Sequence, residues 1–162
     1  MITIALITIS DRSFRGERED KSGVEIRKWA DEKGFKIIAM SIIPDEKEEI
    51  KNKIIEYTNL NINLIVTTGG TGLSPRDVTP EATLSVIDKE IPGFAEVMRR
   101  KSHEITPHAM LSRGVSGIRK QSLIINLPGS PKAVRENLLF IEDAIPHAVD
   151  LLNGNVSDCS SN

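Results

Sequence analysis

The chain has 162 residues, 39% of them hydrophobic and 27% charged, which suits one globular domain and argues against disorder. Lysine and arginine number 21 against 23 acidic residues, so the net charge of -2 gives no general attraction for nucleic acid or an anionic membrane. The apolar run 2–9 is too short to span a membrane and lacks the basic start of a signal peptide. We expect a cytoplasmic protein that binds neither nucleic acid nor membrane, with Cys159 as a bystander thiol.

The N-terminal part of the chain is predicted to begin with a strand and a helix. Residues 2–9 are β-branched and almost continuously apolar, as in a strand buried on both faces, and a polar loop is expected over 13–20. Ser22 with Glu25 three residues later is a capping-box signal, and it predicts a helix over 22–33. The side chains expected to face inward from this helix are Val24, Ile26, Trp29 and Ala30.

Two further strands are predicted over 36–43 and 64–68, with a helix between them. Asp45 and Glu48 form a second cap pair at the start of that helix. Its predicted apolar face consists of Ile50, Ile54 and Tyr57.

The second half of the chain shows the same alternation. Thr79-Pro80 is typical of an N-cap followed by the first helical residue and predicts a helix to about residue 88, and Ser130-Pro131 repeats the signal for a helix to about residue 140. The other predicted elements are a helix over 92–103 with Phe94, Val97 and Met98 inward, a short helix and an edge strand within 106–117, a strand over 122–127, and a helix over 143–153.

Strands that alternate with helices imply an α/β fold, here a three-layer sandwich with a mainly parallel central sheet. We expect residues 1–154 to form a single domain and 155–162 a polar tail. In such a sheet, ligands bind beyond the carboxyl ends of the strands. The segments expected to meet there are Ser10-Asp11-Arg12, Pro44-Asp45, Gly69-Gly70-Thr71-Gly72 and Pro128-Gly129-Ser130.

The glycine-rich segment Gly69–Gly72 follows a predicted strand directly. Glycines allow a positive φ and the close approach of a ligand to backbone amides, which favours phosphate binding. The segment is not a Walker A loop, because no Gly-Lys-Ser/Thr follows, and Pro75 occupies the third glycine position of a dinucleotide fingerprint. The sequence is consistent with a phosphate cradle of another type or with a tight strand-to-helix turn.

Two aspartates are the candidate metal ligands. Asp45 follows one strand end, and Asp77 lies in the loop beyond the glycines. Mg²⁺ prefers one or two carboxylates together with phosphate oxygens and water. For Asp45 a helix N-cap is an equally good interpretation, whereas Thr79 is a better cap candidate than Asp77.

Ser130 precedes a predicted helix whose free amides offer a second anion site, although it could simply cap that helix. Two anion-binding turns on one sheet edge fit a reaction that joins two phosphate-bearing molecules. The three histidines, His103, His108 and His147, show no metal-ligand spacing, and we assign them surface or packing roles.

At these segments the sequence resembles the MogA/MoaB family of molybdenum cofactor biosynthesis proteins. The resemblance covers residues 4 to about 153 and is most specific over 67–83. The matching segments are Ile9-Ser10-Asp11-Arg12, Ile43-Pro44-Asp45, Thr67-Thr68-Gly69-Gly70-Thr71-Gly72, Pro75-Arg76-Asp77-Val78-Thr79-Pro80-Glu81-Ala82-Thr83, Ile91-Pro92-Gly93-Phe94 and Asn126-Leu127-Pro128-Gly129-Ser130-Pro131.

The resemblance implies a molybdopterin adenylyltransferase that uses ATP and Mg²⁺, with Asp45 and Asp77 as the metal-binding and catalytic carboxylates. It implies a homotrimer or, in the MoaB-like branch, a hexamer, and a downstream metal-insertion protein as a partner of the pathway. The residues it assigns to nucleotide or pterin binding are Ser10, Asp11, Gly69, Gly70, Thr71, Gly72, Pro128, Gly129 and Ser130.

Two other functions stay open at this point. A MoaB-type protein that binds pterin without adenylylating it would use the same pocket and would need no metal carboxylates. The related domain of pyrophosphatase-type competence/damage-inducible proteins shares the fold and the glycine cluster, but those chains usually carry a further domain.

Overall fold

The computed structural model describes residues 1–155, so Cys159 and most of the predicted tail lie outside the described residues. A six-stranded sheet has the order β2-β1-β3-β6-β5-β4, in which the first four strands are parallel and the last two antiparallel to their neighbours. The prediction of an α/β fold with a mainly parallel sheet is therefore confirmed. The strands are β1 (Thr3–Ile9), β2 (Lys36–Ile43), β3 (Leu64–Thr68), β4 (Lys89–Glu90), β5 (Ser116–Arg119) and β6 (Ser122–Leu127).

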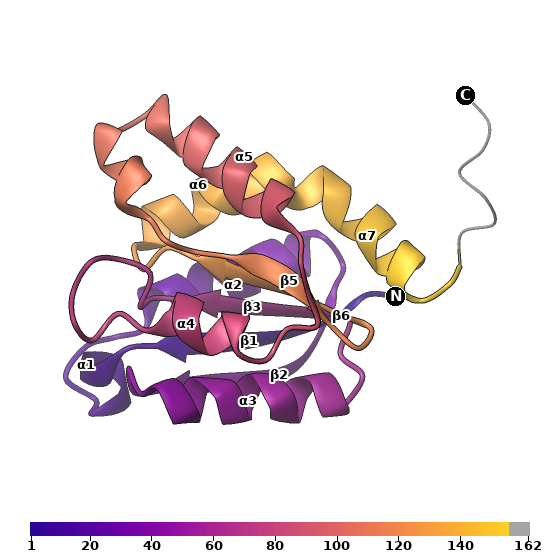
Figure 1. Ribbon diagram of the computed structural model, residues 1–162, viewed down its shortest axis with the longest axis horizontal. Helices are drawn as coiled ribbons and strands as arrows, with labels where there is room; N and C mark the ends of the chain where they lie inside the picture. The colour runs from indigo at the N-terminus through magenta and orange to yellow at the C-terminus, as the bar shows by residue number, and fades with distance from the viewer. Residues whose placement is uncertain (156–162) are drawn as a thin grey trace.

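Helices cover both faces of the sheet, as Figure 1 shows. The helices are α1 (Asp11–Phe14), α2 (Lys21–Glu32), α3 (Lys47–Asn59), α4 (Thr79–Leu84), α5 (Pro92–His103), α6 (Pro131–Ile141) and α7 (Ile145–Leu152). Short 3₁₀ segments cover Pro107–Leu111 and Glu142–Ala144.

Alternate residues of each central strand enter two separate cores. Ile4 and Leu6 of β1 pack with the helices α2, α5, α6 and α7, whereas Ala5 and Ile7 pack with α3 and α4. All of the β1, β3 and β6 side chains except that of Thr3 are buried. Burial on both faces explains why these strands are continuous apolar runs in the sequence.

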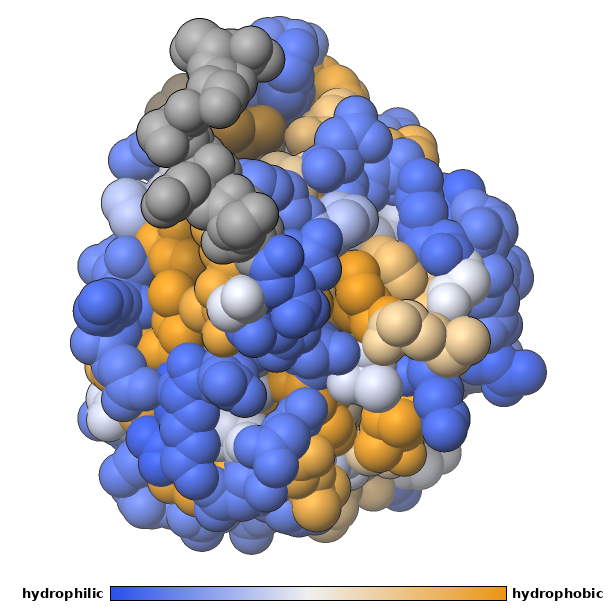
Figure 2. Space-filling view, turned by 90° about the vertical axis from the view of Figure 1, so that its right-hand side faces the viewer, coloured by the Kyte–Doolittle hydropathy of each residue, from blue (hydrophilic) through white to orange (hydrophobic). Residues whose placement is uncertain are grey.

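The surface combines charged side chains with smaller apolar areas. On the face shown in Figure 2, hydrophilic residues predominate and separate several hydrophobic patches. Within residues 1–155, no helix is both long enough and apolar enough to cross a membrane.

The start of α2 differs from the prediction. The helix begins at Lys21, and its N-cap is Asp20, whose carboxylate accepts a hydrogen bond from the Gly23 amide at 2.9 Å. Asp20 is fixed there by the Thr8 hydroxyl, which donates to it at 2.7 Å, so the predicted Ser22 capping box does not form. Val24, predicted to face inward, is 43% exposed, because the helix turns its Ile26, Trp29 and Ala30 side to the sheet.

Four smaller predictions were also wrong. Thr79 is the first residue of α4 and not its N-cap, because its hydroxyl donates to the Gly69 carbonyl at 2.9 Å. Part of the predicted loop over 13–20 belongs to α1. Helix α4 ends at Leu84 rather than near residue 88, because the chain turns to pair β4 with β5. That pairing makes β4 the edge strand and places β5 inside the sheet.

Candidate functional site

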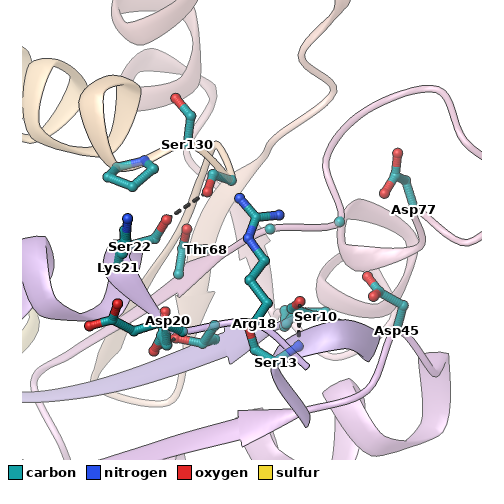
Figure 3. Close-up of a pocket in the computed structure, with 17 residues that line it drawn as sticks. Ser10, Ser13, Arg18, Asp20, Lys21, Ser22, Asp45, Thr68, Asp77 and Ser130 are labelled. Carbon is teal, nitrogen blue, oxygen red and sulfur yellow. Dashed lines mark hydrogen bonds between the residues drawn. The ribbon is translucent and has the colours of Figure 1, made fainter. Parts of the chain in front are cut away.

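A pocket of about 680 Å³ opens beyond the carboxyl ends of the parallel strands. Its walls come from the segments that follow β1, β2, β3 and β6, and from the first turns of α2 and α6 (Figure 3). This volume suits a cofactor-sized molecule. The predicted site residues that line the pocket are Ser10, Asp45, Gly69, Gly70, Asp77, Gly129 and Ser130.

We term one part of the pocket the carboxylate half, which consists of Asp45, Gly70 and Asp77. Within it, Asp45 is held by the segment that follows β1. Its carboxylate accepts a hydrogen bond from the Asp11 amide at 2.9 Å, and the Asp45 amide donates to the Asp11 carboxylate at 3.0 Å. Helix α3 starts after Glu46 without a side-chain cap, so the alternative role of Asp45 as an N-cap is wrong.

Arg76 completes this support. Its guanidinium donates two hydrogen bonds to the Asp11 carboxylate, at 3.0 and 2.9 Å, and lies 2.9 Å from the Glu46 carboxylate. The hydrogen bonds with Arg76 lower the pKa of Asp11, whereas burial raises the pKa of Asp45 above its ordinary value of 3.8. Asp11 therefore supports the site from behind Asp45 without lining the pocket.

The glycine turn brings the backbone close to Asp45. Gly69 has a φ of +98° and Gly70 a φ of +68°. A Cβ on Gly69 would overlap with the carbonyl oxygen of Ile9, and one on Gly70 would lie 3.2 Å from Asp45 Oδ1. Within residues 1–155, the amides of Gly70 and Thr71 donate to no protein acceptor, and the amide of Gly70, which lines the pocket, is free to bind phosphate oxygens.

Asp77 is positioned by the loop that follows the glycine turn. Its carboxylate accepts a hydrogen bond from the Ser74 amide at 3.0 Å. Arg113 fixes the ends of this loop by donating to the carbonyl oxygens of Gly72 and Asp77, both at 2.8 Å, and its own amide donates to the Thr71 carbonyl at 2.8 Å. Thr71 and Gly72 thus shape the loop and do not line the pocket.

The opposite part of the pocket, which we term the helix half (Lys21, Ser22, Thr68, Gly129 and Ser130), is formed by two helix N-termini. The Ser130 hydroxyl caps α6 by accepting from the Ala133 amide at 3.2 Å. The Ser22 hydroxyl at the start of α2 donates to the Gly129 carbonyl at 2.6 Å. The N-terminus of α6 points positive partial charge into the pocket, which favours an anionic ligand group, whereas the N-terminus of α2 is already capped by the Asp20 carboxylate.

Thr68, the last residue of β3, holds the turn beside the helix half. Its hydroxyl donates to the Pro128 carbonyl at 2.7 Å, so Pro128 serves through its backbone and does not itself line the pocket. Figure 3 shows Ser22, Thr68 and Ser130 together, across the pocket from Asp45 and Asp77.

The carboxylate half suits a hard divalent cation that is shared with a ligand. Asp45 and Asp77 are close enough for the charge of Asp77 to contribute to the raised pKa of Asp45. In the part of the chain that the structure describes, no three histidine, cysteine or acidic side chains form a metal cluster. Two carboxylates beside free amides leave room for phosphate oxygens and water as the other ligands, as Mg²⁺ requires.

Sequence reasoning missed several residues of the pocket. Arg18, Lys21, Ser22 and Thr68 all line it, yet the residues near the start of α2 were interpreted as a loop and a capping box. A signal was present, because the segment that follows the first strand must also leave the sheet at its carboxyl edge.

The comparisons with known proteins establish the family of this chain. The family model described as a probable molybdopterin binding domain matches residues 5–147. The chain belongs to this family, the MogA/MoaB family. The match includes the pocket-lining segments that follow β1, β2, β3 and β6.

Curated members of the MogA/MoaB family are similar over most of this chain. It is 45% identical over 157 residues to the molybdopterin adenylyltransferase of Helicobacter pylori strain J99, a match that covers 95% of this chain and 89% of the relative. It is 41% identical to that of Escherichia coli K12 over 169 residues, covering 94% and 86%. The gephyrin of Dictyostelium discoideum is 44% identical over 160 residues, but this region is only 22% of its length and covers 93% of this chain.

Solved structures show the same architecture. The MoaB structure of Thermus thermophilus superimposes with a TM-score of 0.90 at 45% identity and covers 95% of this chain and 98% of its own. A MogA structure gives a TM-score of 0.89 at 36% identity and covers 93% and 99%. The CinA structure of Thermoplasma acidophilum, at 18% identity and a TM-score of 0.69, shares the fold alone.

Proposed function

We propose that this chain is a molybdopterin adenylyltransferase of molybdenum or tungsten cofactor biosynthesis, which transfers AMP from Mg-ATP to molybdopterin and releases pyrophosphate. The observation that carries the proposal is one pocket in which two carboxylates face a turn with free amides, opposite two helix N-termini. The identity of 45% to a molybdopterin adenylyltransferase over 95% of this chain supports the same reaction.

Each half of the pocket has its own substrate in this proposal. Asp45 and Asp77 hold Mg²⁺, and the free amide of Gly70 binds the triphosphate of ATP. Ser130 and the Gly129 turn seat the pterin, with Ser10 on the same edge. When bound, Mg²⁺ neutralises charge on the phosphate chain and so lowers the barrier to attack.

The bonds that change lie between the two halves. An oxygen of the pterin phosphate attacks the α-phosphorus of ATP, a new P–O bond forms, and the bond between the α-phosphorus and its bridging oxygen to the β-phosphate breaks. Pyrophosphate leaves with the electron pair of that bond. The protein contributes by aligning the two phosphates and by placing positive groups where charge develops.

The test mixes the protein with molybdopterin and Mg-ATP and follows adenylylated pterin and pyrophosphate together. We expect equal amounts of the two products, formed only with Mg²⁺, and a loss of product in Asp77→Asn. The matched control is Asp31→Asn, an exposed aspartate on α2 that does not line the pocket. Pyrophosphate release without adenylylated pterin would contradict the proposal.

A pterin-binding protein without catalytic activity is the second candidate, because the helix half could hold pterin on its own. The carboxylate half argues against it: Asp45, Asp11 and Arg76 form a charged network that pterin binding does not require. Tight binding of pterin by the wild-type protein with no product at any Mg²⁺ concentration would favour this candidate.

We also propose that the protein acts as a homotrimer, with a hexamer as the alternative, and passes its product to a downstream metal-insertion protein. Exposed apolar side chains near Arg113 support an assembly: Leu73 is 65% exposed and Met110 is 62% exposed. The segments that carry these two residues are joined by the hydrogen bond from the Arg113 amide to the Thr71 carbonyl. Sedimentation equilibrium would give the mass of the assembly, and a monomer at micromolar concentration would contradict this part of the proposal.

A further inference from the structure

Arg18 lies between the two halves of the pocket. It belongs to the segment between α1 and α2, which places it on the carboxyl side of β1. Figure 3 shows its side chain rising into the pocket, with Thr68 and Ser130 on one side and Asp45 and Asp77 on the other. The guanidinium is therefore placed where groups bound in the two halves would meet.

The guanidinium of Arg18 makes no ion pair and no hydrogen bond with any residue in the range 1–155. Arg15 and Arg76 differ in this respect: Arg15 pairs with Glu17 at 2.9 Å, and Arg76 is held by Asp11 and Glu46. The fold therefore uses Arg15 and Arg76 but leaves the donors of Arg18 available. A guanidinium is a planar fork that matches the oxygens of a phosphate.

Acidic side chains outnumber basic ones along the pocket, so a free guanidinium is one of few positive groups there that could bind phosphate. Asp45 and Asp77 line it together with Glu19 and Asp20, whereas the cationic side chains that line it are those of Arg18 and Lys21. Both substrates of the proposed reaction carry phosphate, so their reacting ends repel each other and the carboxylates. A bound cation offsets this repulsion in the carboxylate half, and a second positive group is needed where the two phosphates approach.

We propose that Arg18 binds the phosphates that are joined and stabilises the charge that develops on the transferred phosphoryl group. This inference rests on the proposed adenylyl transfer. As the pterin-phosphate oxygen bonds to the α-phosphorus and the bond to the bridging oxygen breaks, the guanidinium donates to the non-bridging oxygens. Arg18 gives up no proton, and pyrophosphate leaves with the electrons of the broken bond.

The test compares Arg18→Ala, Arg18→Lys and the control Arg15→Ala, which removes an arginine of the same segment that does not line the pocket. Circular dichroism and the melting temperature first establish that all three fold. We expect Arg18→Ala to lower kcat by about 100-fold, because one lost donor to transition-state charge typically has an effect of this order. Arg18→Lys should recover about 10-fold of this loss, because it restores the charge without the fork.

Binding of Mg-ATP, measured by calorimetry in the absence of pterin, separates the outcomes. We expect Arg18→Ala to weaken it by less than about 10-fold, because Arg18 acts most strongly when both phosphates are present. Turnover of Arg18→Ala equal to that of Arg15→Ala would overturn the inference while leaving the proposed function intact. If the wild-type protein forms no adenylylated pterin, the proposed function fails instead, and the inference fails with it.

Discussion

The carboxylate half and the helix half of the pocket are built by different interactions. In the first, charged groups support one another: Arg76 holds Asp11, and the Asp11 amide holds Asp45. In the second, neutral hydroxyls meet backbone groups, as in the bond from Ser22 to the Gly129 carbonyl. We infer from this comparison that the carboxylate half fixes the charges that the proposed reaction uses, whereas the helix half fixes the shape of the proposed binding surface.

The largest effect should come from Asp45→Asn. The variant keeps an oxygen that can accept from the Asp11 amide but loses the negative charge with which Asp45 would hold the proposed divalent cation. We expect kcat to fall by about 10³-fold at saturating substrates, with pterin affinity retained.

Ser130→Ala should do the reverse of Asp45→Asn, raising KM for pterin while changing kcat by less than about 5-fold. If both variants changed the same parameter, the two halves would not differ in the way we describe.

The next effect is on stability, at the glycine turn. Gly69→Ala combines a φ of +98° with an overlap between the new Cβ and the Ile9 carbonyl. We expect the free energy of unfolding in urea to fall by about 3 kcal/mol. The control, Gly16→Ala, also has a positive φ of +73°, but a Cβ there would meet no atom within 4 Å, so a loss of about 1 kcal/mol is expected. Equal losses would show that the contact with β1 is unimportant.

Arg76→Ala tests whether the charged network positions Asp45. We expect a drop in kcat/KM of about 10-fold and a higher Mg²⁺ concentration for half-maximal activity, because the Asp11 support loosens. The free energy of unfolding should change by less than about 1 kcal/mol, because Arg76 is half exposed. Arg135→Ala, which removes a surface pair with Glu32 in which neither residue lines the pocket, should leave both activity parameters unchanged. Rescue by Arg76→Lys at ordinary Mg²⁺ would argue against a role for the paired hydrogen bonds.

The predicted strands matched the structure because burial on both faces leaves a strong pattern. Those over 36–43, 64–68 and 122–127 have the predicted bounds, as does the helix over 92–103. The parallel arrangement then placed the candidate residues at one edge. This required no knowledge of side-chain contacts, only that the carboxyl ends of parallel strands coincide.

The missed features depend on contacts between distant residues. Ser22 looked like a cap in sequence, but its hydroxyl binds the Gly129 carbonyl, 107 positions away. The true cap, Asp20, is selected by Thr8 on β1. Similarly, Asp45 has the sequence context of a cap for the next helix, but its carboxylate binds the Asp11 amide instead. A local pattern does not reveal which partner tertiary structure brings to a polar side chain.

The smallest predicted effect is on the free energy of unfolding, which is lowered when the partly buried carboxyl of Asp45 is ionised. Burial raises its pKa above 3.8, so as pH rises the unfolded chain releases this proton before the native protein does. The contribution of this group to stability is therefore greatest below pH 3.8 and falls as pH rises through the native pKa. Asp45→Asn removes that loss and should be more stable than the wild type at pH 7, by on the order of 0.5 kcal/mol for a partly exposed group.

Urea unfolding of both proteins across pH, without divalent cation, measures this difference. The difference in stability should shrink as the pH is lowered toward 3.8, because the wild-type carboxyl then becomes protonated and is neutral like the asparagine of the variant. Added Mg²⁺ should stabilise the wild type and not Asp45→Asn, because only the native wild-type site offers both charges to the cation. A wild type that gains stability over the variant as pH rises would mean that the hydrogen bond from Asp11, rather than burial, dominates the pKa of Asp45. The carboxylate half would then be stabilising in itself, and its energetic contrast with the helix half would disappear.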